Sequence, residues 1–141
     1  MKKTRLTVGL FSFIALLGIW LGFNPPGRFG WHRFGLTVYS GVPFPVVDLV
    51  IQTNGFPRIR SGKAHWVSRE EFEGLLGSCA DARPEVVVIG IGYDSRVKVD
   101  GRIPASSGPA LEILPTPQAI DRFNQLRSAG KRVAALIHST C

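Results

Sequence analysis

The sequence predicts a mixed α/β domain in which an antiparallel meander precedes a β-α-β unit. Two apolar runs, within residues 85–90 and 132–138, have the uninterrupted character of central strands that are covered on both faces. A segment of helical periodicity lies between them, from Thr116 to Gly130. Shorter stretches with strand alternation precede the first run. Together these observations favour one small domain with a partly parallel sheet.

The helix between the two central strands has clear end signals. Thr116 can serve as its N-cap, and Pro117 stands in the first turn, where a missing N–H costs nothing. Gly130 can adopt the left-handed conformation that ends a helix. We expect the helix to pack on the sheet through one apolar stripe, formed by Ala119, Ile120, Phe123 and Leu126.

The meander is expected in the residues before this unit. Residues 34–40, 45–51 and 56–60 have strand character, and Asn54-Gly55 is a hairpin turn signal. A short amphipathic helix follows them, because Ser68 and Glu71 have the spacing of a capping box ahead of an apolar stripe.

The carboxyl-terminal half resembles a known family. The runs VVVIGIG and LPTPQAIDRFNQLRSAGKRVAALIHSTC are similar to those of the MTH-nine-three-eight-like domain family, most specifically in T-P-x-A-x-x-x-F-N-x-L-x-x-x-G-K-R-V-A-A. The resemblance covers about residues 34–141 and implies the small fold of that family. The family includes an assembly factor of mitochondrial respiratory complex I, so the resemblance implies a protein partner in a membrane complex.

The amino-terminal part divides into three segments. Residues 1–5 are basic, residues 6–23 contain no charged side chain, and residues 24–33 are a Pro/Gly linker ahead of a globular domain at 34–141. As a helix, the apolar segment would be about 27 Å long, just enough to span a bilayer. The sequence therefore predicts a single-pass transmembrane helix that acts as a signal anchor, with the membrane as partner and location.

Two questions about this segment stay open from the sequence. A cleavable signal peptide is the alternative to an anchor, although no small-x-small cleavage site precedes the linker. The basic residues near the start favour a cytoplasmic amino terminus, which places the domain outside, whereas the family that the chain resembles works mostly inside cells or organelles.

The net charge is +7, and the distribution of this charge along the sequence excludes one class of function. Up to Val47 there are five Lys or Arg residues and no acid, whereas from Asp48 onward twelve basic residues face ten acidic ones. A nucleic-acid-binding domain needs a cationic face on its folded part. No such cluster occurs here, so we expect no nucleic-acid partner.

A cleft is predicted where the glycine-rich turn meets the start of the last helix. If the strands that precede these two segments are parallel, their carboxyl ends lie at one edge of the sheet. Free backbone N–H groups at that edge could hold a carboxylate or another anion. The candidate ligand-binding residues are Gly90, Gly92, Tyr93, Thr116 and Asn124. The alternative is that the glycines only permit a turn, Thr116 only caps the helix, and Asn124 is a surface residue.

The cysteines and histidines show no metal motif in the sequence. His138 and Cys141 are three positions apart, which on an extended strand sends them to opposite faces, and His32 and His65 lack metal-motif spacing to them. We therefore predict no metal site, no cofactor and no catalytic residue. A disulfide from Cys79 to Cys141 is an alternative only in an oxidising compartment.

These observations favour one function and leave one alternative. The leading hypothesis is a membrane-anchored binding or assembly module with no assigned reaction. The alternative is a small-molecule or anion-binding protein, or an enzyme, that uses the edge formed by Gly90–Gly92 and Thr116–Pro117.

Overall fold

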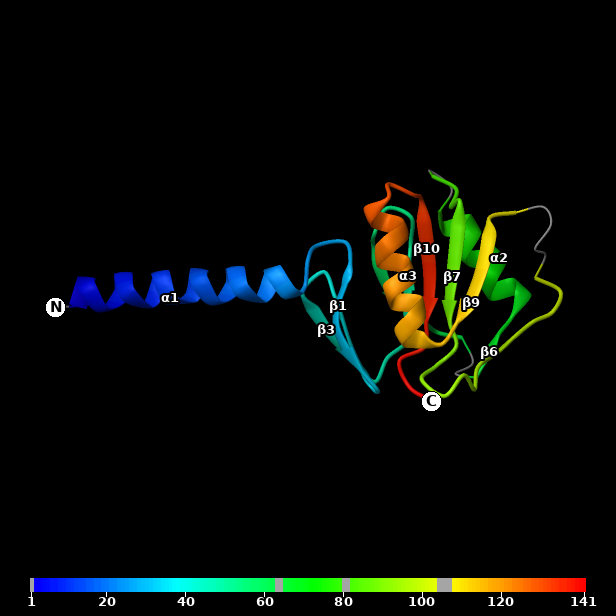
Figure 1. Ribbon diagram of the computed structural model, residues 1–141, viewed down its shortest axis with the longest axis horizontal. Coiled ribbons are helices and arrows are strands. Elements are labelled where there is room, and N and C mark those ends of the chain that lie inside the picture. The colour runs from blue at the N-terminus through cyan, green and yellow to red at the C-terminus, as the bar shows by residue number, and fades with distance from the viewer. Residues whose placement is uncertain (1, 63–64, 80–81, 104–107) are drawn as a thin grey trace.

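A five-stranded mixed sheet forms the centre of the domain in the computed structural model (Figure 1). The structure describes residues 2–62, 65–79, 82–103 and 108–141, with side chains from residue 7 onward. The strand order is β5-β4-β10-β7-β9. The parallel strands are β7 (Val86–Gly90), β9 (Ala110–Leu114) and β10 (Val133–Ile137), and β4 (Leu49–Ile51) and β5 (Pro57–Ile59) continue the sheet in antiparallel pairing.

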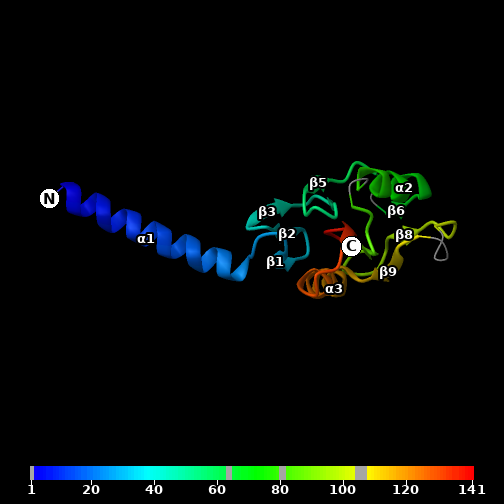
Figure 2. The same cartoon turned by 90° about the horizontal axis from the view of Figure 1, so that it is seen from above.

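Both faces of this sheet are covered by helices. Helix α3 (Thr116–Ser128) packs on one face, and α2 (Arg69–Ser78) lies against the other (Figure 2). Every residue of β7 and β10 is buried, which confirms the prediction of two central strands. Each large apolar side chain enclosed in this way contributes roughly 1.5 to 3 kcal/mol to folding.

The two covering helices begin differently from what their sequence signals suggest. The Ser68 hydroxyl accepts the Glu71 N–H at 3.1 Å, as predicted for the cap of α2, but the Glu71 carboxylate pairs with Arg60 instead of reaching back to the cap. Helix α3 has Pro115 at its cap position and no side-chain cap. The expectation that Thr116 caps α3 is therefore wrong, because its hydroxyl is used elsewhere.

A second, three-stranded antiparallel sheet packs beside α3. It consists of β1 (Phe29–Arg33), β2 (Leu36–Tyr39) and β3 (Val42–Pro45). Its first strand falls inside residues 24–33, for which we predicted a linker. The side chain of Asn124 holds that strand on α3, since it donates to the Phe29 carbonyl at 2.8 Å and accepts the Phe29 N–H at 3.0 Å. A short parallel pair, β6 (Trp66–Val67) with β8 (Lys98–Val99), completes the strands within the described residues.

The prediction of a single-pass membrane anchor over residues 6–23 is wrong. Among the described residues, none of the helices combines the length and the apolar character that a bilayer crossing needs. The apolar segment lies in α1 (Lys2–Phe23). The predictions of a membrane partner, a signal anchor and a single-pass membrane location are therefore wrong as well.

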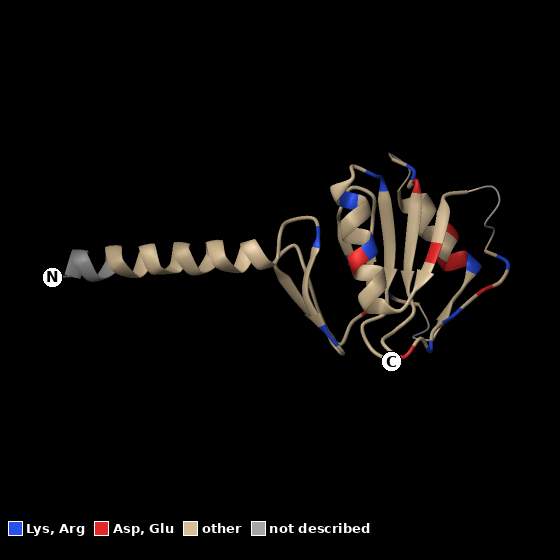
Figure 3. Cartoon of the chain, viewed as in Figure 1, with Lys and Arg blue, Asp and Glu red and all other residues tan. Residues whose placement is uncertain are grey.

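Charged side chains are mixed in sign over the face of the domain in Figure 3. Side chains of both signs occur on α3, on α2 and at the strand ends. This face has no cationic stripe of the kind that would follow a phosphate backbone.

Candidate functional site

The carboxyl edge of the parallel strands brings together three of the five predicted site residues. The Gly92 N–H donates to the Thr116 hydroxyl at 3.0 Å, and the Thr116 N–H donates to the Gly92 carbonyl at 3.0 Å. The Thr116 hydroxyl in turn donates to the His138 carbonyl at 2.6 Å. Gly90 lies next to these hydrogen bonds, since a Cβ added to it would be 3.0 Å from the Thr116 hydroxyl. We call these contacts of Gly92, Thr116 and His138 the Thr116 joint.

The backbone groups that we predicted to bind an anion are hydrogen-bonded within the chain in this joint. The backbone amides of Gly92 and Thr116 both have partners within the chain, and the Tyr93 N–H donates to the Thr140 carbonyl at 3.3 Å. An anion at this edge stays a prediction. What the geometry shows is a rigid connection between β7, α3 and the segment after β10.

The other two predicted site residues have different surroundings. Asn124 lies against β1 and does not contribute to the edge. The Tyr93 ring packs near Phe34, with ring centroids 5.9 Å apart. Its buried hydroxyl has no hydrogen-bond partner among the described residues, and burial raises the pKa of Tyr93 above its usual value.

Residues 138–141 leave β10 and fold back over the glycine-rich turn. Gly92 has φ +95°, and a Cβ there would collide with the carbonyl of Cys141 and lie 2.7 Å from that of Thr140. Only glycine therefore permits this close approach of the two backbones. The approach places the Cys141 side chain over the end of the sheet.

Replacing Gly92 with alanine should displace this segment and destabilise the protein. Gly130 provides the matched control, because its φ is also positive, at +75°, but an added Cβ would meet nothing within 4 Å. We expect Gly130→Ala to cost about 1 to 2 kcal/mol from the left-handed backbone alone. Gly92→Ala should cost clearly more in urea unfolding. Equal losses for the two variants would contradict the close packing of residues 140–141 on the turn.

A buried ionic network supports the end of β10 from the side of β4. The Arg60 guanidinium, with a side chain 2% exposed, makes paired contacts to the Glu71 carboxylate at 2.6 and 2.9 Å and reaches Asp48 at 3.3 Å. Asp48 then lies 2.6 Å from His138 Nδ1 and accepts the Ser139 N–H at 2.9 Å. The network fixes the His138 ring in one orientation.

The pKa of Arg60 reflects this network. Burial acts to lower it, but the hydrogen bond to Glu71 and the charges of Glu71 and Asp48 outweigh burial, so the pKa is raised. The guanidinium is therefore charged throughout the physiological range and compensates the two carboxylates. No local pattern in the sequence indicated this role, because Arg is rarely enclosed unless it is paired.

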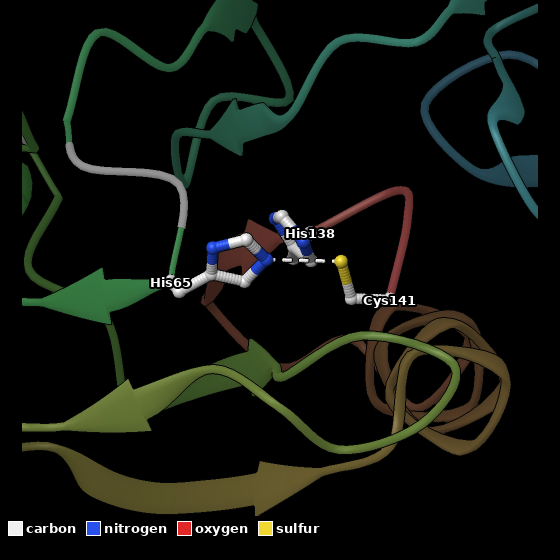
Figure 4. A group of neighbouring side chains, drawn as sticks. All are labelled: His65, His138 and Cys141. Atoms are coloured by element: carbon white, nitrogen blue, oxygen red, sulfur yellow. Dashed lines mark hydrogen bonds between the residues drawn. The ribbon is translucent and has the colours of Figure 1, made fainter.

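The structure brings together three residues of metal-binding types that the sequence analysis separated. His65, His138 and Cys141 each offer one ligand atom, and these atoms lie within 4.8 Å of one another (Figure 4). His65 Nε2 is 2.9 Å from Cys141 Sγ, and the two imidazole rings meet at 61° with centroids 5.5 Å apart. We call these residues the His65 cluster. The alternation argument failed because β10 ends at Ile137, and the chain turns before it reaches Cys141.

A pocket lies at the amino-terminal edge of the parallel strands, opposite the Thr116 joint. Its volume is about 760 Å³, and it is lined by residues of α2 and by the segments that enter β7 and β9. It borders residues 80–81 and 104–107 in the sequence, which are outside the described residues, so we build no site on it. The carboxyl edge remains the better candidate, because polar groups from distant segments converge there.

The fold and this edge define a small mixed α/β domain that presents its polar groups at the ends of parallel strands, where proteins of this class usually bind ligands. Residues 30–138 match the family described as "Protein of unknown function (DUF498/DUF598)", and the chain belongs to that family. A comparison with curated proteins found no match.

Solved structures agree with this assignment. The chain is similar to the protein MT938, with 35% identity, a TM-score of 0.66, and coverage of 81% of this chain and 98% of that one. It is also similar to the conserved hypothetical protein PH1505 of Pyrococcus horikoshii OT3, with 25% identity, a TM-score of 0.70, and coverage of 81% and 99%. A Mth938-like domain of Bordetella pertussis shares the fold at 18% identity, with a TM-score of 0.59 and coverage of 79% and 85%. The predicted resemblance to the MTH-nine-three-eight-like family is confirmed.

Proposed function

We propose that this chain is a protein-binding and assembly module, and that α1 together with the β1–β3 sheet forms its contact surface. The supporting observation is the exposure of large apolar side chains at this end of the molecule. Phe11 is 69% exposed, Phe23 77%, Trp31 52% and Val46 73%. Large apolar side chains are exposed along most of α1, and extended apolar surface of this kind typically marks an interface.

The position of α1 supports binding by insertion into a partner. The helix projects away from the sheet and its covering helices, so the domain leaves most of its length uncovered (Figure 1). Its inner end is fixed, because Trp20 Nε1 donates to the Gly41 carbonyl at 2.9 Å and the Leu21 side chain adjoins Gly41. A helix that is apolar on all sides is stable when other protein surrounds it. The chemistry that fits is an apolar groove or helix bundle in another protein.

Replacing Phe11, Phe13 and Leu16 together with glutamine tests the proposal. These side chains are exposed, so the change should leave the domain intact. Glutamine keeps helix propensity while it removes the apolar surface. We expect a stoichiometric partner, purified with the full chain from its native cells and reconstituted from the two isolated proteins, to bind the variant at least about tenfold more weakly.

A matched control changes three exposed residues of α3, Gln118, Asp121 and Gln125, to alanine. This variant should bind the partner like the natural chain. Unchanged affinity of the α1 variant, or recovery of nothing except further copies of the chain itself, would contradict the proposal.

A further inference from the structure

The His65 cluster has the donor set of a transition-metal site. Two imidazoles and one thiol are ligands that zinc-type ions prefer, whereas calcium and magnesium ions prefer oxygen. The three residues come from segments far apart in sequence, since His65 precedes β6 and the other two follow β10. We propose that His65, His138 and Cys141 bind one zinc-type divalent ion, a role that is independent of the partner surface proposed above.

The contacts around His138 prepare it as a ligand. Asp48 Oδ2 lies 2.6 Å from His138 Nδ1, so the carboxylate accepts the proton of that nitrogen. The Nε2 atom then carries the lone pair that a metal requires. A carboxylate behind a metal-binding histidine is a recurrent arrangement, because it fixes the tautomer and increases the basicity of the ligand. Asp48 is itself held by Arg60 and by the Ser139 N–H.

Both carboxylate oxygens of Asp48 are used in these contacts, so Asp48 serves as a supporting residue and not as a ligand. The Thr140 hydroxyl lies 3.2 Å from His138 Nε2 and would compete with an ion for that nitrogen. It belongs to the same turned segment as Cys141. A bound ion would replace this single hydrogen bond with a stronger metal–nitrogen bond.

The donor atoms must shift by about 1 Å to hold one ion, because they lie within 4.8 Å of one another, whereas two nitrogen ligands of a tetrahedral zinc ion are about 3.3 Å apart. His65 Nε2 and Cys141 Sγ are 2.9 Å apart, whereas a tetrahedral zinc ion holds a nitrogen and a sulfur about 3.6 Å apart, given bonds of about 2.0 to 2.1 and 2.3 Å. The His65 side chain is exposed and Cys141 is partly exposed, so both can move by this amount. Three protein ligands leave a fourth position for water or another small ligand.

Metal titration of the full, tag-free chain under reducing conditions tests the proposal. We expect one zinc ion per chain by competition with a chromophoric chelator, and a thiolate-to-cobalt charge-transfer band when Co²⁺ is used as the probe. Cys141→Ser should remove that band. Cys141→Ser and His65→Gln should each weaken zinc binding by at least about 100-fold, since loss of a supporting residue alone costs about 10- to 100-fold.

The chain provides matched controls for both residue types. His32→Gln and Cys79→Ala change a histidine and a cysteine outside the cluster, and both variants should bind zinc like the natural chain. Because His65 is exposed, His65→Gln should keep the melting temperature of the metal-free protein. The proposal is overturned if zinc binds substoichiometrically, if the cobalt spectrum shows no thiolate, or if His65→Gln binds zinc as tightly as the natural chain.

Discussion

Replacing Arg60 with methionine is expected to lower the free energy of unfolding by about 3 to 5 kcal/mol. Methionine preserves much of the side-chain volume but removes the charge that compensates Glu71 and Asp48, whose side chains are only 18% and 14% exposed. It also removes the donor to the Trp66 carbonyl at 2.6 Å. Urea unfolding followed by circular dichroism measures the loss.

The control for this prediction is Arg122→Met. Arg122 also makes a paired contact with a carboxylate, to Glu112 at 2.7 and 2.9 Å, but its side chain is 41% exposed. An exposed pair is worth less than about 1 kcal/mol. A comparison of the two variants therefore separates the effect of burial on stability from the effect of pairing with a carboxylate. If both lose the same free energy, the enclosed network around Arg60 does not stabilise the end of the sheet as described.

Replacing Thr116 with valine should cost about 2 to 4 kcal/mol, because two backbone groups lose their partner at once. The substitution keeps the shape of a fully buried side chain and removes only the hydroxyl. It leaves the Gly92 N–H and the His138 carbonyl without the bonds of 3.0 and 2.6 Å that they make in the joint. Thermal and urea unfolding should both register the loss.

Thr37 offers a close comparison within the same protein. It is also fully buried, but among the described residues its hydroxyl has no hydrogen-bond partner. Thr37→Val should therefore be neutral or stabilising, since it replaces an unsatisfied polar atom with an apolar one. A Thr116→Val variant as stable as Thr37→Val would show that the joint does not hold the edge together.

The main α/β unit could be predicted from the sequence because its signals are local. The strands β7 and β10 are uninterrupted apolar runs, and the stripe on α3 has helical spacing, so the pattern alone indicated a sheet covered on both faces. Strand β1 was not predicted, since its sequence, FGWHR, follows two prolines and contains a glycine. It is held in place by contacts with α3, which no local pattern shows.

The site could be predicted only in part, for a physical reason. Glycines after a buried strand and a threonine before a helix indicated where two segments meet, and the structure places Gly90, Gly92 and Thr116 there. The position of Cys141 depends on the close approach of residues 140–141 to Gly92, which only a residue without a side chain permits. That contact joins residues almost fifty positions apart, so a periodicity argument restricted to residues 138–141 could not find it.

The failed membrane prediction and the proposed partner surface start from the same residues. The sequence showed an apolar segment, and the structure shows it as an exposed helix joined to a small sheet. The partner surface and the His65 cluster lie on different elements, so a variant at one should leave the other unchanged. Zinc binding by the Phe11, Phe13 and Leu16 variant would demonstrate this separation.

X-ray absorption at the zinc edge tests most directly whether the turned segment brings Cys141 to the two histidines. For the zinc-loaded natural chain we expect one sulfur at about 2.3 Å and two imidazole nitrogens at about 2.0 to 2.1 Å. The sulfur should vanish in Cys141→Ser and persist in Cys79→Ala. A first shell of oxygen and nitrogen alone in the natural chain would contradict the account.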